Sequence, residues 1–393
     1  MKKALVYYLY GTKNAGDMAI CIGTIEVLRK LNYKITMVSR FSESEDEYEI
    51  SKSYVNSYFP DVKVVPGPFS FERDFGAIKK AAAYGKSFAK VCGIIPDSGT
   101  KALIDEADVV FFNGGNLLRG ESVKDYARLV ALFYPIQLAQ KAGKPIYCLP
   151  QSTAGISRIG KLLLGKYMRS FTKIYIREKK SLEQLRRVFP DIRFEYCTDM
   201  AFFCADTEKA QQEAHNKYRK RSPKANVALI LRNTGIGDIG NVDSDTEMKL
   251  LSAMRKYVEN HPEKEYWIVV QTMKDREISD TFAKLISNKC QVNIVEDHDP
   301  LTLRELYKQM EFVITMRLHA GILALSTHIP VIGLFCSNWG LKNPGMMETF
   351  EMPYLMVDQR DGEIADSVER IPEDAPVRIA DQIDSFRDTL VFD

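Results

Sequence analysis

The amino-acid sequence predicts an α/β fold with two doubly wound halves, and three observations support this prediction. The chain has 393 residues, more than a single hydrophobic core usually supports. Short apolar runs alternate with longer stretches of helical periodicity, a pattern typical of parallel sheets covered on both faces. A polar segment, residues 206–225, interrupts the alternation near the middle of the chain and predicts a linker.

The N-terminal half, residues 1–205, opens with a strand-like run followed by a helical pattern. The run Ala4–Tyr10 is short and no small-residue cleavage site follows it, so we interpret it as a buried strand and not as a signal peptide. Residues 15–31 then place apolar side chains at helical spacing. Further strand-like runs follow at 34–40, 108–115, 144–152, 173–176 and 194–203.

The C-terminal half, residues 226–393, restarts the alternation, and its last helix is a candidate to return to the N-terminal half. Its strand-like runs lie at 226–235, 265–273, 311–318 and 329–335. Two Rossmann-like domains joined by a linker fit a GT-B-like architecture, with the active site in the cleft between them. The physical reason is that ligands bind beyond the carboxyl ends of parallel strands, where helix N-termini present unpaired N–H groups.

Composition argues against several classes of protein. The formal net charge of +2 gives no strong basic field, so we expect no nucleic-acid partner. No stretch approaches 18 uninterrupted apolar residues, so we expect no membrane span. The seven cysteines are scattered without a CxxC pair, which favours free thiols in a reducing compartment, the cytoplasm, and argues against a zinc site.

Cationic side chains follow several strand-like runs directly, at the positions where ligands of α/β proteins bind. They are Arg177, Arg232, Arg317 and His319. Arginine matches carboxylate and phosphate oxygens, so their convergence predicts a compact ligand with several negative charges. The alternative is that each pairs with a nearby acid, such as Glu178 or Asp199. Neither a Walker A motif nor GxGxxG is present.

Six segments occur in order over residues 8–345 and resemble motifs of one family, the polysaccharide pyruvyl transferases. They are YGTKNAGDMAI (10–20), FFNGGNLL (111–118), LPQSTAGI (149–156), YIREKKSLEQL (175–185), CTDMAFF (197–203) and MRLHAGILALSTHIPVIGLFCSNWGLKN (316–343). The last, with its Arg-Leu-His start, is the most specific of the six. Asn113 stands where the family often has a glycine.

The resemblance implies a metal-independent enzyme without a cofactor. It would transfer the pyruvyl group of phosphoenolpyruvate, its co-substrate, to a sugar of a polysaccharide or of a lipid-linked precursor, forming a ketal and releasing phosphate. The Arg-Leu-His segment of the C-terminal half, Arg317, Leu318 and His319, would hold the donor. The further candidates for donor binding are Arg232 and Lys342 in the C-terminal half and Arg177 in the N-terminal half. The N-terminal loops would hold the acceptor through Asn14, Gly16, Asn113, Gly114, Gly115, Asn116, Gln151 and Ser152.

Two residues are candidates for catalysis. Histidine side chains in general change charge near neutral pH, so His319 would protonate the methylene carbon of the donor, or alternatively only bind its phosphate. Asp17, expected across the cleft from Arg317, would activate an acceptor hydroxyl. The alternative for Asp17 is electrostatic, because an acid in the first turn of a helix is favoured in any protein.

Two basic amphipathic stretches, residues 77–95 and 158–171, suggest peripheral contact with the inner face of the cytoplasmic membrane. The alternative is that they are ordinary helices that cover the core.

Two rival functions stay open. One is a GT-B glycosyltransferase with a nucleotide-sugar donor, for which Glu296, Asp297 and Asp299 offer carboxylates to a ribose. The other is a non-catalytic protein that binds anionic sugars.

Overall fold

A computed structural model describes residues 1–69, 85, 87–218, 225–234, 242–340, 342–359 and 362–392. The contacts divide the chain into two compact units, each built on one parallel sheet. Unit 1 comprises residues 1–12, 20–203 and 389–393, and unit 2 comprises residues 13–19 and 204–388. The predicted α/β fold with two Rossmann-like domains is confirmed.

The sheet of unit 1 is parallel throughout, and its strands lie in the order β3-β2-β1-β4-β6-β7-β8, with β5 paired to β6. The strands are β1 (Lys2–Leu9), β2 (Tyr33–Ser39), β3 (Lys63–Val65), β4 (Val109–Phe112), β5 (Gly115–Gly120), β6 (Ile146–Ile156), β7 (Lys173–Ile176) and β8 (Phe194–Tyr196). The helices are α1 (Ala15–Lys30), α2 (Asp46–Tyr58), α4 (Ser98–Glu106), α5 (Val123–Lys141), α6 (Arg158–Met168) and α7 (Lys179–Val188).

The sheet of unit 2 is also parallel, in the order β11-β10-β9-β12-β13-β14. Its strands are β9 (Asn226–Ile230), β10 (Glu265–Val270), β11 (Gln291–Glu296), β12 (Phe312–Thr315), β13 (Val331–Phe335) and β14 (Tyr354–Met356). The helices are α8 (Glu208–Lys217), α9 (Ser244–Asn260), α10 (Arg276–Ile286), α11 (Pro300–Tyr307), α12 (Leu318–Leu325), α13 (Lys342–Thr349), α14 (Ile364–Glu369) and α15 (Ala375–Asp388).

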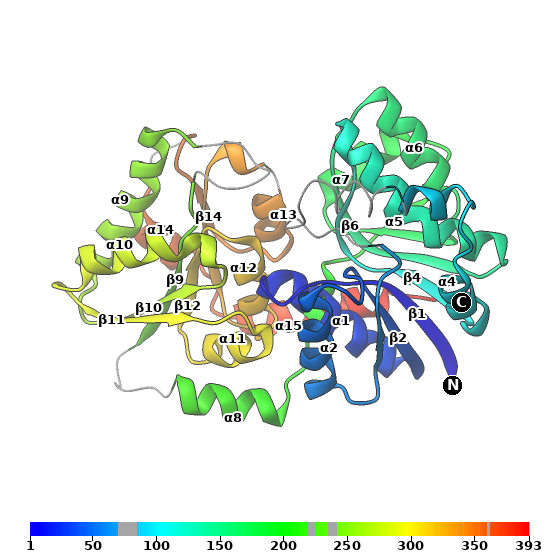
Figure 1. Cartoon of the computed structure of the whole chain (residues 1–393). Helices are drawn as coiled ribbons and strands as arrows, with labels where there is room; N and C mark the ends of the chain where they lie inside the picture. Colours follow the sequence, from blue (N-terminus) through cyan, green and yellow to red (C-terminus); the bar gives the residue numbers. More distant parts are fainter. Residues whose placement is uncertain are drawn as a thin grey trace. The chain divides into compact units, whose positions relative to one another are not determined.

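Both sheets reverse their strand order beside the first strand of the unit. β1 lies between β2 and β4, and β9 lies between β10 and β12. In unit 2, α9 contacts α10, α11 contacts α12, and α10 and α11 lie on opposite faces of the sheet (Figure 1). The central strands β9 and β12 are mostly apolar and are buried along their whole length. Such a reversal is where ligands of doubly wound proteins bind.

The segment predicted as a linker differs from that prediction. Residues 208–217 form α8, which packs on α11 within unit 2. The hydroxyl of Tyr218 donates to buried Asp297, and Arg304 and Lys308 form ion pairs with Asp206. The polar composition obscured this helix because only two alanines, Ala210 and Ala214, are buried along it. Residues 219–224 lie outside the described part of the chain.

The end of the chain also departs from the predicted boundary. The last helix, α15, belongs to unit 2, and only residues 389–393 group with unit 1. There the ring of Phe392 packs edge-on against Phe111 and Tyr147, and the hydroxyl of Tyr175 bonds to the backbone of Val391 at 3.0 and 3.1 Å.

Candidate functional site

Two of the predicted arginines stand side by side at the carboxyl edge of the unit 2 sheet. Ile230 and Thr315 are paired across β9 and β12, and each is the last residue of its strand. Arg232 and Arg317 both lie two residues further on, so the register places them at matching positions. This is the reversal point of the strand order, where ligands of doubly wound proteins bind.

Arg317 is held by a carboxylate that the sequence analysis missed. Its Nε donates to Oδ2 of Asp275 at 2.6 Å, and its Nη2 donates to Oδ1 of the same residue. Asp275 is 2% exposed and also accepts the backbone N–H of Asn233 at 2.9 Å. It lies in the short 3-10 helix Met273–Asp275 after β10, the neighbour of β9. The only signal in the sequence was its place after a strand.

Arg232 adds a positive charge to this pair. Its guanidinium stacks on the ring of Trp339 at 4.6 Å, and its Nε is buried without a hydrogen-bond partner. Among the described residues no carboxylate forms an ion pair with it. Burial and then the charge of Arg317 lower the pKa of Arg232 to about 10, against the opposing effect of Asp275. Two guanidinium groups therefore stand near one carboxylate, which pairs with Arg317, and the resulting net charge of about +1 suits an anionic ligand.

The Arg-Leu-His segment opens α12. Arg317 is the N-cap, and Leu318 and His319 are the first two helical residues, both half-buried. The positive end of the helix dipole favours an anion at this position. Lys342, also half-buried, begins α13 in the same unit.

The imidazole of His319 lies against the backbone of Gly16. A Cβ atom at Gly16 would stand 2.3 Å from Cγ and Nδ1 of His319, so a larger residue would displace the ring. Gly16 is the second residue of α1, and its N–H donates to Oδ1 of Asn14 at 3.0 Å. The sequence offered no signal for a contact between residues so far apart in the chain.

Asp17, next to Gly16, is placed differently from the prediction. Residues 13–19 group with unit 2 by their contacts, so Asp17 belongs to the same unit as Arg317 and not to the opposite one. The physical reason is the close packing of the first turn of α1 on His319. Asp17 is half-buried.

The side chain of Arg177 is occupied by other partners and is not available to a donor, which differs from the prediction that it binds the donor. Its side chain is 5% exposed in unit 1. Nε donates to Ser152 Oγ at 2.6 Å and to Glu178 Oε1 at 3.1 Å, and Nη1 donates to Asp199. Burial by itself would lower the pKa of Arg177, but Asp199 and Glu178 overcome this and hold the pKa above its ordinary value. The alternative named for Arg177, pairing with nearby acids, is what the structure contains.

Ser152, Asn113 and Gln151 were predicted to contact the acceptor but are fully buried and internally bonded. Ser152 donates to Glu178 at 2.5 Å. The amide of Asn113 donates to Tyr8 O at 3.0 Å and accepts from Thr24 Oγ1 at 2.7 Å. The side-chain amide of Gln151 donates to the carbonyl of Asn113 at 2.5 Å and accepts from the N–H of Leu117 at 3.1 Å. These residues tie strands together and leave no polar atom for a sugar.

The remaining loop residues lie beside that network. Gly114 accepts the hydroxyl of Tyr10 at 2.7 Å, and both Gly114 and Gly115 are buried. Gly115 has φ +140°, a conformation that favours glycine. Asn116 is half-buried, and its Oδ1 has no hydrogen-bond partner. Asn14 is exposed.

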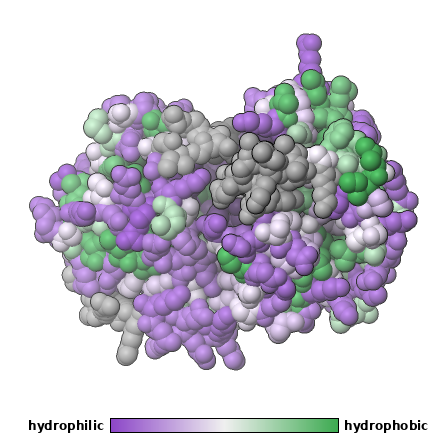
Figure 2. Space-filling model, in the orientation of Figure 1, coloured by the Kyte–Doolittle hydropathy of each residue, from purple (hydrophilic) through white to green (hydrophobic). Residues whose placement is uncertain are grey.

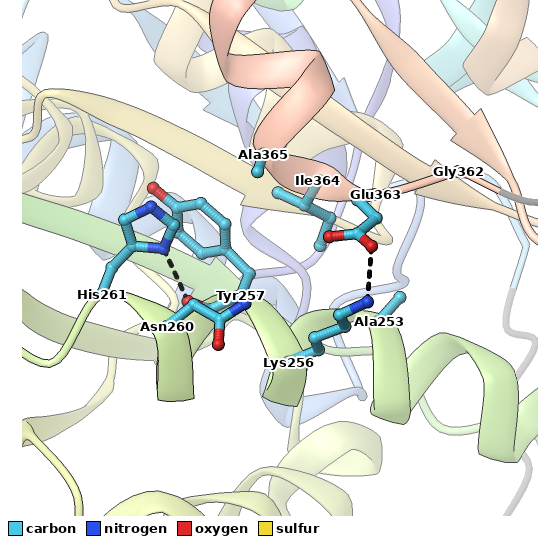
Figure 3. A pocket seen from close by; sticks show the side chains of 9 residues that line it. All are labelled: Ala253, Lys256, Tyr257, Asn260, His261, Gly362, Glu363, Ile364 and Ala365. Carbon is cyan, nitrogen blue, oxygen red and sulfur yellow. Dashed lines mark hydrogen bonds and ion pairs between the residues drawn. The ribbon is translucent and has the colours of Figure 1, made fainter.

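A cavity of about 240 Å³ lies elsewhere in unit 2, where the end of α9 meets the start of α14 (Figure 3). Lys256 and Glu363 form an ion pair of 2.5 Å beside it, and the ring of His261 stacks on Tyr257. His261 directly precedes the turn into β10, so this cavity belongs to the amino edge of the sheet. It contains none of the predicted site residues.

Within the described ranges, no group of three or more histidines, cysteines or acids is arranged to hold a metal ion. Metal independence stays a prediction. Likewise, no helix in the described part of the chain combines the length and apolarity needed to cross a bilayer.

Solved structures with a similar fold include sugar-nucleotide enzymes at low sequence identity. The UDP-GlcNAc 2-epimerase of Neisseria meningitidis bound to UDP-GlcNAc is 11% identical, with a TM-score of 0.56, and the match covers 99% of this chain and 93% of that one. UGT2 of Phytolacca americana, complexed with UDP-2fluoro-glucose and pterostilbene, is 8% identical, with a TM-score of 0.53 and coverage of 98% and 94%. These matches show the fold alone, a GT-B arrangement of two Rossmann-like domains.

No curated protein sequence matches the chain. The family model described as polysaccharide pyruvyl transferase matches residues 14–338, which is most of the chain and includes both Gly16 and the Arg-Leu-His segment. The chain belongs to the polysaccharide pyruvyl transferase family.

Proposed function

We propose that the protein transfers the pyruvyl group of phosphoenolpyruvate to two hydroxyls of a sugar, in a polysaccharide or its lipid-linked precursor. The observation that carries this proposal is the cluster of Arg232, Arg317 and Asp275, with its excess positive charge, beside His319 at the start of α12. Phosphoenolpyruvate carries a carboxylate and a phosphate within a few bonds, so it matches two neighbouring guanidinium groups.

The chemistry assigns a role to each group. Arg317, fixed by Asp275, and Arg232 bind the two anionic ends of the donor. His319 donates a proton to the methylene carbon, which creates an oxocarbenium-like centre on the neighbouring carbon. One sugar hydroxyl adds to that centre and loses its proton to Asp17. The second hydroxyl gives its proton to the now neutral imidazole of His319, displaces inorganic phosphate and closes the ketal. Lys342 assists the departing phosphate.

The nucleotide-sugar alternative has weaker support. Its predicted ribose ligands are engaged elsewhere: Glu296 pairs with Arg276, Asp297 accepts from Thr302 at 2.9 Å, and Asp299 caps α11. The fold itself does not discriminate, because the similar solved structures use nucleotide sugars on the same architecture.

Purified protein mixed with candidate donors and a panel of sugar glycosides tests the reaction class. We expect phosphate release from phosphoenolpyruvate only when a sugar acceptor is present. Nucleotide release from a nucleotide sugar would replace this proposal with the rival. Binding of anionic sugars without turnover of any donor would support the non-catalytic alternative.

A variant separates the two roles of His319. His319→Ala should keep phosphoenolpyruvate binding within about tenfold and lose most turnover, because the proton donor contributes about 10²–10⁴-fold to rate. Equal loss of binding and turnover would assign His319 to phosphate binding alone. Arg169→Gln is a matched control, since Arg169 pairs with Asp191 on the surface of unit 1.

We also propose peripheral contact with an anionic membrane through α6. Its residues Ile159 and Leu162 are exposed, among Arg158, Lys161 and Lys166. Figure 2 shows hydrophobic surface over the region of α6. Exposed apolar side chains flanked by lysine and arginine suit an anionic lipid surface. Of the other predicted stretch, residues 77–95, residues 77–84 and 86 lie outside the described part of the chain.

Vesicle sedimentation tests this contact. Wild-type protein should sediment with phosphatidylglycerol vesicles and not with phosphatidylcholine vesicles, and Leu162→Ser should reduce sedimentation several-fold. Protein that stays in the supernatant with both vesicles would leave α6 as an ordinary covering helix.

A further inference from the structure

Three arginines that the sequence analysis did not single out gather at the carboxyl edge of the unit 1 sheet. Arg40 follows β2 directly, and its backbone N–H donates to the carbonyl of Leu9, the last residue of β1, at 2.9 Å. Arg119 lies in β5. Arg128 lies in α5, and its Nη2 donates to the carbonyls of Leu117 and Arg119 at 3.3 and 3.4 Å.

This basic cluster, Arg40, Arg119 and Arg128, stands where the strand order of unit 1 reverses. β1 and β4 are neighbours at that point, and the hydroxyl of Tyr10, after β1, bonds to the carbonyl of Gly114, after β4. Tyr10 is close enough to Arg128 to influence its pKa. Doubly wound domains bind their ligands at this position.

Among the described residues, one acid, Asp125, forms ion pairs with two members of the cluster. Arg119 Nε and Arg128 Nη2 both reach the same oxygen, Oδ1 of Asp125, at 2.8 and 3.6 Å. Asp125 is also the capping-box residue of α5, so its other oxygen accepts from the backbone and hydroxyl of Ser122. No acid among the described residues forms an ion pair with Arg40. Glu121 is the other nearby acid, and its exposed carboxylate lies against Gly155.

Arg128 is a half-buried member of the basic cluster. Its side chain is 19% exposed, and its Nε is buried without a hydrogen-bond partner. Burial lowers its pKa to about 10, and the charges of Arg119 and Arg40 act in the same direction, against that of Asp125. Asn116, beside it in β5, has a buried Oδ1 that also lacks a partner. Keeping such groups together is costly unless a ligand compensates them.

We propose that Arg40, Arg119 and Arg128 form a second anion site, which binds a phosphate or carboxylate group carried by the sugar acceptor. The guanidinium groups supply charge-assisted hydrogen bonds to oxyanions, and Asn116 offers an amide to a neighbouring hydroxyl. The role of the anion as part of the acceptor rests on the proposed function. The existence of the site does not, because it stands on unit 1 alone.

Calorimetric titration of the full chain tests the site with two probes, inorganic pyrophosphate and glucuronate. The Arg317→Gln variant is the background, because it removes anion binding at the donor site. We expect at least one probe to bind in this background, and Arg128→Gln or Arg40→Gln to weaken that binding about tenfold, the usual effect of losing a charged hydrogen bond. Arg169→Gln should leave it unchanged.

The pattern of binding identifies the source of the anion. Preference for pyrophosphate indicates an acceptor linked to a phosphate-bearing carrier, and preference for glucuronate indicates an acidic sugar. No binding of either probe, or equal binding by the double variant Arg40→Gln/Arg128→Gln with unchanged thermal unfolding, would overturn the site. Loss of binding in these variants, in a protein that releases no phosphate from phosphoenolpyruvate, would keep the site and reject the proposed function.

Discussion

Arg177 in unit 1 and Arg317 in unit 2 both follow a strand of a parallel sheet and both pair with a buried acid, yet their surroundings differ in charge. Arg177 contacts two carboxylates, Glu178 and Asp199, and its side chain is 5% exposed. Arg317 contacts one carboxylate, Asp275, with the charge of a second arginine, Arg232, nearby, and its side chain is 25% exposed. The first network carries about one negative charge and the second about one positive charge.

The difference teaches which strand-end arginines are able to bind an anion. Both residues follow a strand, so this position alone does not determine whether an arginine binds an anion. The local balance of charge and the exposure of the side chain determine it, because a guanidinium already paired with two acids gains nothing from a third anion. We assign Arg177 to stability and the pair Arg232 and Arg317 to binding.

The largest expected effect is on stability, from Arg177→Gln. Removing the cation leaves Glu178 and Asp199 buried without compensation, which typically costs about 3–5 kcal/mol of the free energy of unfolding. Denaturant unfolding of wild type and variant measures this. The fraction that stays folded should bind phosphoenolpyruvate like wild type. A stable variant with weakened donor binding would break the comparison and return Arg177 to the donor site.

The second effect is on the donor, from Arg232→Gln. Arg317 and Asp275 then neutralise each other, so the site loses its excess charge. We expect kcat/KM for phosphoenolpyruvate to fall about 10- to 100-fold, since hydrogen bonds to charged groups contribute about 1.5–3 kcal/mol. The midpoint temperature of thermal unfolding should stay the same or rise. The reason is that the variant removes a buried charge with which no acid among the described residues forms an ion pair. Unchanged kcat/KM together with a lower midpoint would make Arg232 a structural residue.

These two sites also mark how far the sequence reaches. The fold could be predicted because apolar strands and helical patterns alternate in the sequence. Arg232 and Arg317 could be proposed as candidates because each follows a strand. Asp275 was missed since it belongs to no motif and meets Arg317 only through the order of the strands.

Other site residues were misjudged for a related reason. Asn113, Gln151 and Ser152 share the residue types of binding loops, and their saturation by backbone and side-chain partners depends on three-dimensional packing. The place of Asp17 in unit 2 follows from the contact of Gly16 with His319, which no local pattern encodes.

The contact between Gly16 and His319 supplies the third prediction. It tests the histidine that lies beside the network of Arg232, Arg317 and Asp275. Gly16→Ala places a Cβ against the imidazole, so His319 must move, and we expect kcat to fall about tenfold with a smaller change in KM. Gly99→Ala is the matched control: Gly99 is also the second residue of a helix, α4, and an added Cβ there meets nothing within 4 Å. Equal activity of both variants would show that the position of His319 does not matter.

The smallest effect is the pH dependence of donor binding by the network of Arg232, Arg317 and Asp275. It distinguishes Arg232 from Arg177. Arg232 has a pKa of about 10, below its ordinary value, chiefly because of burial. As pH rises through about 10 it loses its proton, so affinity for phosphoenolpyruvate should fall a few-fold by pH 10.5, while the donor phosphate stays fully ionised above pH 8. Stability changes in the opposite direction, because a lowered pKa means that the protonated form opposes folding, and this cost starts to decrease as pH rises above about 10. Arg177, whose pKa is raised, contributes no such change. Titration calorimetry of phosphoenolpyruvate binding between pH 8 and 10.5, on wild type and Arg232→Gln, measures this effect. A fall in affinity of equal size in both proteins would show that Arg232 does not cause it. The excess charge of unit 2 would then have no functional consequence.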